Sequence, residues 1–150
     1  MKIGIGADHR GIKLKSAIKK YLEGKYHVKD YGAHSAESVD YPDIALELAK
    51  DVAAGRLKYG ILLCYTGQGM VMAANKVRGI RAAVCTTKRI AVYARAHNNA
   101  NVLVIPAGFI RSKERAQQVI KTFLSTPFEG GRHLRRINKI KKYENSTRRV

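Results

Sequence analysis

A cysteine and two glycines stand together where an apolar run gives way to an amphipathic stretch. Cys64 closes the run 59–64, and the chain continues Tyr-Thr-Gly-Gln-Gly up to Gly69. Glycines let the backbone turn tightly near a ligand, and a helix expected to begin here points its free N–H groups into the loop. Such surroundings lower the pKa of a thiol and stabilise anions. The loop can supply a thiolate base and an oxyanion cradle, although a buried structural cysteine fits it equally well.

Two further polar groups have residue types suited to proton transfer and ligand binding. Asp8, His9 and Arg10 follow the first apolar run, where they can bind hydroxyl groups and phosphate. A capping aspartate with exposed neighbours is the commoner use of such a triplet. His97 and Asn98 end an amphipathic stretch. Histidine can shuttle a proton between oxygens and asparagine can hold a hydroxyl, but histidine at a helix end is more often a cap.

Basic residues dominate the charge of the chain. There are 29 Lys and Arg against 11 Asp and Glu, a net charge of +18, and eight of the basic residues lie between Arg132 and Val150. Arg132 and Arg136 share one face of a predicted helix and suit a phosphate, whereas a solvated basic face is the ordinary explanation. The balance favours anionic partners, whether phosphorylated metabolites, nucleic acid or a membrane surface.

Short apolar runs alternate with amphipathic stretches along the whole chain. The runs predict strands over residues 2–7, 26–31, 59–64, 80–85 and 102–105. Apolar residues spaced i, i+3, i+4 and i+7 predict packed helices near 14–22, 45–52 and 116–124. Further helices are expected over 67–77, 88–96 and 132–143.

This alternation predicts an α/β fold, a three-layer doubly wound (Rossmann-like) domain with a five-stranded parallel sheet and a C-terminal helix. The domain is expected to span residues 1–143, with residues 144–150 as a flexible, polar, basic tail. Ligands of such folds bind at the carboxyl ends of strands, near the switch in strand order. The groups at Cys64, Asp8 and His97 follow predicted strand or helix ends, where we expect the site.

Length and composition restrict the number of cores and the cellular compartment that we expect. With 150 residues and 45% hydrophobic content the chain can bury one core. It has no run of 18 apolar residues, so we expect no membrane span, and its N-terminus does not resemble a signal peptide. Cys64 and Cys85 do not form a disulfide framework. We therefore expect a protein of the reducing cytoplasm.

Six segments resemble, in order, motifs of type B ribose-5-phosphate isomerases, a family that also includes galactose-6-phosphate and allose-6-phosphate isomerases. The resemblance covers residues 1 to about 143. The segments are Asp8-His9-x-Gly11, Asp40-Tyr41-Pro42, Cys64-x-Thr66-Gly67-x-Gly69 followed by Ala73-Ala74-Asn75-Lys76, Gly79-Ile80-Arg81-Ala82, His97-Asn98-x-Ala100-Asn101, and Gly130-Gly131-Arg132-His133.

The resemblance implies an aldose–ketose isomerase of carbohydrate metabolism, as in the pentose phosphate pathway, that interconverts ribose 5-phosphate and ribulose 5-phosphate. A six-carbon sugar phosphate is the alternative substrate. The catalytic residues would be Cys64, as the base between C1 and C2, with Thr66 and His97 opening the sugar ring. Neither a metal nor an organic cofactor is implied. Family members are dimers or tetramers with each pocket built from two chains, and we expect a homodimer or tetramer here.

The resemblance also implies the residues that bind the substrate. Backbone N–H groups from Thr66 to Met70, including Gly67 and Gly69, would hold the enediolate oxygen. Asp8 and Asn98 would bind hydroxyl groups, and the phosphate would contact three basic side chains, namely His9, Arg132 and Arg136.

Two departures from the family pattern, and one difference from some of its members, affect these expectations. Tyr65 stands where relatives usually have glycine, so it is costly if that position needs a positive φ; otherwise its ring borders the substrate and narrows the pocket mouth. Some relatives carry a carboxylate around position 70 or 71, where this chain has Met70 and Val71. We therefore expect Cys64, and not a carboxylate, to be the base that transfers the proton. The family's function does not require the strongly basic tail.

Other classes of protein fit the sequence less well. A cysteine phosphatase needs arginine six residues after its cysteine, and Met70 stands there. A receiver domain needs an acidic cluster after the first strand, and Asp8 is alone. A dinucleotide-binding module needs Gly-x-Gly-x-x-Gly after a strand, whereas Gly4 and Gly6 lie inside one. A nucleic-acid-binding protein fits the charge but lacks zinc spacing and aromatic signatures, so only weak, nonspecific binding is expected.

Overall fold

Five strands form one fully parallel sheet in the computed structural model, which describes residues 1–110 and 112–147. Their order is β2-β1-β3-β5-β4. The ranges are β1 (Lys2–Ala7), β2 (His27–Asp30), β3 (Tyr59–Cys64), β4 (Ala82–Val84) and β5 (Val102–Pro106). The three central strands are almost wholly buried, as expected for a sheet covered on both faces.

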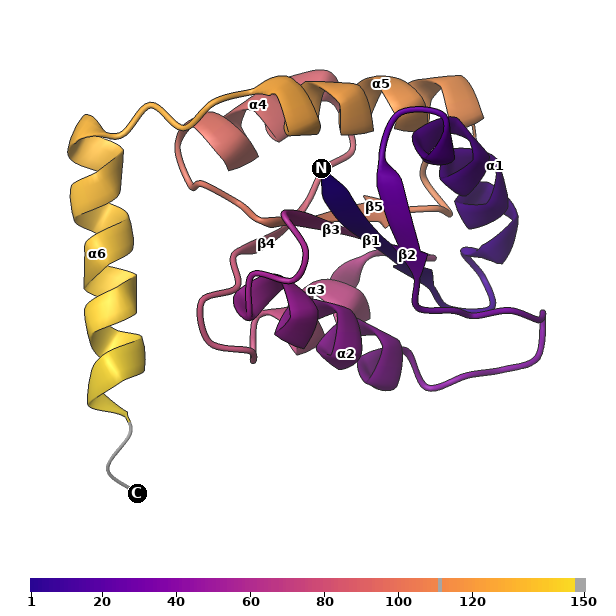
Figure 1. The fold of residues 1–150 in the computed structure, drawn as a ribbon, viewed down its shortest axis with the longest axis horizontal. Coiled ribbons are helices and arrows are strands. Elements are labelled where there is room, and N and C mark those ends of the chain that lie inside the picture. Colours follow the sequence, from indigo (N-terminus) through magenta and orange to yellow (C-terminus); the bar gives the residue numbers. More distant parts are fainter. Residues whose placement is uncertain (111, 148–150) are drawn as a thin grey trace.

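Five helices cover the two faces of the sheet (Figure 1). One face carries α1 (Ile12–Glu23), α4 (Lys88–Ala96) and α5 (Lys113–Ser125), and the other carries α2 (Tyr41–Ala53) and α3 (Gln68–Ala74). A separate apolar cluster fills the space on each side. The predicted three-layer, doubly wound fold is therefore confirmed.

The predicted helical stripes are the buried faces of these helices. Ile18 and Leu22 of α1, Leu48 of α2, and Val119 and Phe123 of α5 are at most 1% exposed. The element ends differ by a few residues from the prediction: α3 ends at Ala74 rather than at residue 77, and β4 is confined to Ala82–Val84.

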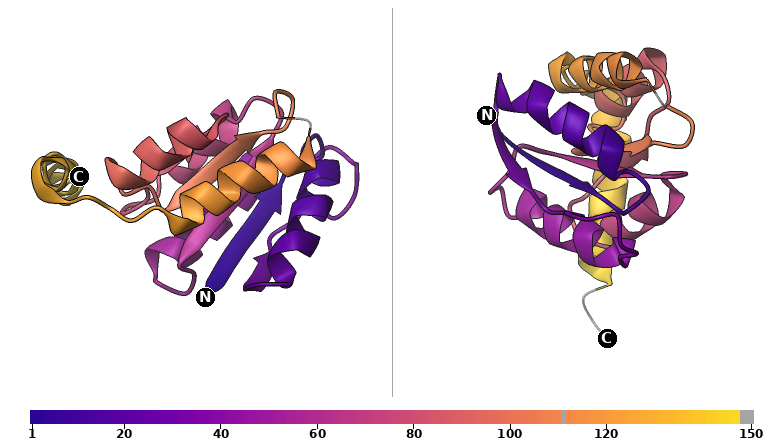
Figure 2. Two further views of the ribbon diagram at one scale, coloured as in Figure 1. Left: turned by 90° about the horizontal axis from the view of Figure 1, so that it is seen from above. Right: turned by 90° about the vertical axis from the view of Figure 1, so that its right-hand side faces the viewer.

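The last helix, α6 (Gly131–Ser146), stands apart from the three layers beside the edge strand β4 (Figures 1 and 2). It extends three residues beyond Tyr143, where the sequence predicted its end, and residues 148–150 of the predicted tail lie outside the described residues. Arg78 anchors the far end of the helix by donating to the backbone oxygen of Glu144 at 2.9 Å and to the Asn145 side chain. Residues 144–146 are therefore part of the helix.

The strand order changes direction at β1, and this arrangement brings two polar loops together. β1 pairs with both β2 and β3, so the chain leaves β1 and β3 at neighbouring points on the carboxyl edge of the sheet. The backbone N–H of Asp8 donates to the carbonyl oxygen of Leu63 at 3.1 Å. The loops that begin at Asp8 and at Cys64 are thus adjacent.

Among the described residues, no helix is both long enough and apolar enough to cross a membrane.

Gly11 permits the close approach of the Asp8 loop to β3. A Cβ atom at this position would lie 2.7 Å from the carbonyl oxygen of Leu63 and 3.1 Å from the Cβ of Ala7. We expect Gly11→Ala to lower the free energy of unfolding by about 1–3 kcal/mol, because backbone atoms must move. Urea denaturation measures the change.

Gly24→Ala is the matched control, because a Cβ there meets its nearest neighbour at an ordinary 3.7 Å and the backbone φ of −69° suits alanine. This variant should be as stable as the parent or more stable by up to about 1 kcal/mol. Equal stability losses in the two variants would contradict the assigned role of Gly11.

Candidate active site

Cys64 ends β3 with its side chain turned into the loop that begins α3. The Sγ atom accepts a hydrogen bond from the backbone N–H of Gly67 at 3.2 Å. Gly67 has a φ of +80°, a conformation that glycine adopts without steric cost, and it directly precedes α3. Sequence and structure agree that the thiol lies beside the N–H groups at the start of a helix.

The protonation of Cys64 differs from the prediction. Burial raises the pKa of the thiol above its ordinary value, against the opposing hydrogen bonds from the N–H groups of Met70 and Gly67. The carboxylate of Asp8 raises the pKa further. The prediction that the loop lowers this pKa is therefore wrong for this chain, because desolvation of the 5% exposed residue outweighs the amides.

Asp8 and His9 lie at the same edge of the sheet. Oδ1 of Asp8 accepts hydrogen bonds from the backbone N–H groups of Arg10 and Gly11, each at 3.0 Å, so this oxygen organises the loop. The Nδ1 atom of His9 is buried and has no hydrogen-bond partner among the described residues. A buried polar atom without a partner is costly, so His9 is well suited to contact a polar ligand.

Tyr65 adopts an ordinary backbone conformation. Among the described residues, Asn99 alone combines a side chain with a positive φ, so the strain considered for tyrosine at position 65 does not arise. The Arg10 guanidinium lies 3.7 Å from the centre of the Tyr65 ring, and Phe109 is a further ring neighbour. A Cβ on Gly108 would lie 2.5 Å from the Tyr65 ring. The ring is therefore fixed beside the loop of Cys64.

Tyr41 also belongs to this edge, and sequence reasoning gave it no role. A Cβ on Gly69 would lie 2.5 Å from the Tyr41 ring, so the ring packs directly on the glycine loop. The motif segment Asp40-Tyr41-Pro42 therefore lies against the glycine loop through Tyr41. Thr66, whose hydroxyl accepts from the N–H of Gln68 at 3.3 Å, is exposed at the same place.

Four predicted site residues lie away from the Cys64 loop, namely His97, Asn98, Arg132 and Arg136. His97 directly follows α4, and the chain then enters β5 at Val102. A segment that leads from a helix into a parallel strand lies at the amino edge of the sheet, whereas Cys64 lies at the carboxyl edge. β5 runs from one edge to the other. Its five residues, at about 3.3 Å per residue, place the ends of the strand about 13 Å apart.

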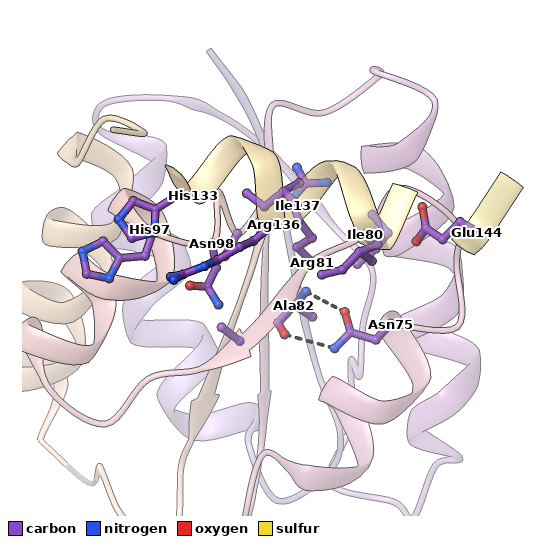
Figure 3. A pocket seen from close by; sticks show the side chains of 13 residues that line it. Asn75, Ile80, Arg81, Ala82, His97, Asn98, His133, Arg136, Ile137 and Glu144 are labelled. Atoms are coloured by element: carbon purple, nitrogen blue, oxygen red, sulfur yellow. Dashed lines mark hydrogen bonds between the residues drawn. The ribbon is translucent and has the colours of Figure 1, made fainter. Parts of the chain in front are cut away.

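A cavity of about 500 Å³ lies at this second location, between α6 and the β4 edge (Figure 3). Its lining includes His97, Asn98 and Arg136. Arg132 is exposed in the first turn of α6. The structure thus gathers the predicted site residues in two groups, one at each edge of the sheet. The first group contains Cys64, Tyr65, Thr66, Gly67, Gly69, Met70, Asp8 and His9.

His97 belongs to a cluster of side chains that sequence reasoning missed. Its ring stacks on that of His133, with 4.2 Å between centres and an angle of 8°. The Nε2 atoms of His97 and His133 lie 3.7 and 3.5 Å from Oε2 of Glu129. Within the motif segment Gly130-Gly131-Arg132-His133, His133 contacts His97, and the preceding Glu129 lies beside both imidazoles.

This trio is the one group of potential metal ligands among the residues that the structure describes. A metal bound to imidazole lies close to the ring plane, about 2.0–2.1 Å from the nitrogen. Two nearly parallel rings stacked at 4.2 Å do not share a plane, so one ion cannot lie in both. The geometry suits a carboxylate shared between two imidazoles better than a chelated ion.

Comparison with known proteins identifies the family. The model of the ribose/galactose isomerase family matches residues 3–140. Ribose-5-phosphate isomerase B of Escherichia coli is 41% identical over 140 residues, or 93% of each chain. A probable ribose-5-phosphate isomerase B of Mycoplasma genitalium is 43% identical over 148 residues, or 97% of each chain.

Solved structures give the same result. A ribose 5-phosphate isomerase of Thermotoga maritima has a TM-score of 0.91 and 51% identity, covering 94% of this chain and 97% of its own. The structure of ribose-5-phosphate isomerase B from Mycoplasma genitalium, with bound ribulose 5-phosphate, has a TM-score of 0.92 and 41% identity over 96% of both chains. The chain is therefore an isomerase and belongs to the ribose/galactose isomerase family, as its six motifs predicted.

Proposed function

We propose that this protein interconverts ribose 5-phosphate and ribulose 5-phosphate by cofactor-free proton transfer, with Cys64 as the base. The observation that carries the proposal is the Cys64 thiol at the carboxyl end of β3, in contact with the N–H groups that begin α3. The relative with bound ribulose 5-phosphate, of nearly the same length and fold, supports this choice of substrate.

Proton transfer between two neighbouring carbons needs one base and a stabilised enediolate. The thiolate of Cys64 takes the proton from C2 of the open-chain aldose, and the released electron pair forms the C1–C2 double bond of the enediolate. The backbone N–H groups from Thr66 to Met70 stabilise the negative oxygen. Return of the proton to C1, with proton transfer between the two oxygens, gives the ketose.

The remaining site residues are assigned to binding and ring opening. Asp8 and Asn98 bind hydroxyl groups, and His9, Arg132 and Arg136 bind the phosphate. Thr66 and His97 open the sugar ring. The opposite positions of Cys64 and His97 in one chain support a pocket that combines the carboxyl edge of one copy with His97, Asn98 and α6 of a second copy.

The surface of α6 supports the same assembly. Three large apolar side chains of this helix, Leu134, Ile140 and Tyr143, are 43%, 54% and 70% exposed. Packing of α6 on a second copy would bury these side chains and place Arg132 and Arg136 near the partner's loops. We include a homodimer or tetramer in the proposal, and a cytoplasmic location that keeps the free thiols Cys64 and Cys85 reduced.

Replacement of the base tests the reaction. Cys64→Ala should lower kcat/KM for ribose 5-phosphate by about 10²–10⁴-fold, while the circular dichroism spectrum stays unchanged. Cys85→Ala is the matched control, because Cys85 is also a buried free thiol but packs in the apolar cluster on the other face of the sheet from Cys64. It should keep wild-type activity.

A six-carbon sugar phosphate belongs in the same assay. Preference for it would leave the base in place and overturn the choice of substrate. Full activity of Cys64→Ala would overturn the assignment of the base.

The raised pKa of the Cys64 thiol predicts the pH dependence of the reaction. The active form is the thiolate, whose fraction grows as the pH approaches the pKa from below. Log kcat/KM should therefore rise by about one per pH unit between about pH 7 and 9, where the sugar phosphate is already a dianion. A profile that is flat over this range would contradict a thiol base with a raised pKa.

Mixing two inactive variants tests the shared pocket. Cys64→Ala and His97→Ala proteins should each be nearly inactive alone. Mixed in equal amounts, unfolded and refolded together, they should regain about a quarter of wild-type activity, because random pairing rebuilds that share of the sites. Separately refolded proteins mixed afterwards are the control. No recovery in an assembled sample would show that one chain supplies the whole site.

A further inference from the structure

Two aromatic rings stack on the ring of His97. The Tyr93 ring does so with 5.0 Å between the ring centres and an angle of 27° between the ring planes. The His133 ring does so with 4.2 Å and 8°. Tyr93 comes from α4 and His133 from α6. Two elements far apart in the sequence thus restrict the plane of one imidazole.

Glu129 is held beside this stack by its backbone. Its N–H donates to the carbonyl oxygen of Ala96, the last residue of α4, at 3.0 Å. Gly130, with a φ of +71°, then turns the chain into α6. The connection between α5 and α6 is therefore pinned to the residue that precedes His97, and the carboxylate lies near both imidazoles.

The charges around the cluster favour a neutral His133. Burial, followed by the neighbouring His97, Arg132 and Arg136, lowers the pKa of His133, whereas Glu129 raises it. The side chain of His133 is only 8% exposed, that of His97 is 33% exposed and that of Glu129 is 58% exposed. A buried, neutral ring beside a more accessible one suits a support for His97.

We propose that Glu129 and His133 are positioning residues for His97 in the opening of the sugar ring, an inference that rests on the proposed function. Stacking on His133 and Tyr93 fixes the plane of the His97 ring. The Glu129 carboxylate, whose Oε2 atom lies 3.7 Å from Nε2 of His97, favours by electrostatic attraction the ring orientation that turns this nitrogen toward it. Neither positioning residue needs to touch the substrate.

The step they support is a balanced proton exchange. When the furanose opens, the bond between C1 and the ring oxygen breaks, the ring oxygen gains a proton and the C1 hydroxyl loses one. A proton shuttle must face both oxygens in turn, so the orientation of its ring controls the rate. Proton transfer at Cys64 begins only afterwards, on the open chain.

Because ring opening precedes proton transfer at Cys64, two assays can distinguish a positioning role in ring opening from a general effect on the structure. Ribose 5-phosphate is mainly a closed ring, whereas ribulose 5-phosphate cannot close a five-membered ring because its C5 oxygen carries the phosphate. Exchange of the C1 proton of ribulose 5-phosphate in D₂O, followed by NMR, therefore reports the base alone. Conversion of ribose 5-phosphate reports ring opening and the base together.

The decisive variants are Glu129→Gln, which keeps shape and loses charge, and His133→Ala, which removes the ring that stacks on His97. Both should lower kcat/KM for ribose 5-phosphate by about 10- to 100-fold. Both should change the C1-proton exchange of ribulose 5-phosphate by less than about twofold. Glu129→Asp should restore part of the loss, since it returns the carboxylate.

Glu114→Gln is the matched control. Glu114 is an exposed carboxylate that accepts from the Ser112 hydroxyl at 2.9 Å, and it lies at the opposite end of α5 from the segment that carries Glu129. This variant should leave both reactions unchanged.

The outcomes distinguish this inference from the proposed function. Equal losses in both reactions, or no loss in either, would overturn the positioning role while leaving Cys64 untouched. Cys64→Ala should lower both reactions by about 10²–10⁴-fold, and full activity of that variant in both would overturn the part of the proposed function that makes Cys64 the base. His97→Ala should reproduce the pattern of Glu129→Gln with a larger loss.

Discussion

The common direction of all five strands controls where each polar group of this protein can lie. In a parallel sheet every loop that leaves a strand is at the carboxyl edge, and every loop that enters one is at the amino edge. Cys64 leaves β3, whereas His97 precedes β5. The two residues assigned to successive steps of one reaction are therefore on opposite edges of their own chain, and the second copy in the proposed assembly would bring them together.

The Cys64 loop shows two opposing effects on one thiol. Backbone N–H groups favour the thiolate, while burial and the neighbouring Asp8 favour the neutral thiol and prevail. The same burial removes water from the place where an enediolate would form, and there a fixed N–H group acts more strongly than it would in water. A base that is mostly protonated at neutral pH is compatible with this site, because proton transfer needs only the reactive fraction.

The segment after α5 differs in character from the rest of the chain. It leaves the three layers, is tied to α4 by the backbone of Glu129 and continues as a helix with exposed apolar side chains. Its basic residues include Arg132 and Arg136, assigned to the phosphate. The high density of positive charge near residues 132–142 thus has a use in the proposed pocket, where an anionic substrate must be held.

Much of this protein was determined by its sequence alone. Apolar periodicity specified the strands, the packed faces of α1, α2 and α5, and hence the doubly wound fold, because burial of these stripes dominates the energy of folding. Ordered motifs identified the family and pointed to Cys64. The tertiary structure alone decided the raised pKa of Cys64, the relaxed backbone of Tyr65, the extension of α6 and the cluster of Glu129 and His133 around His97. Those features depend on desolvation and on contacts between residues far apart in the chain, which periodicity and spacing do not encode.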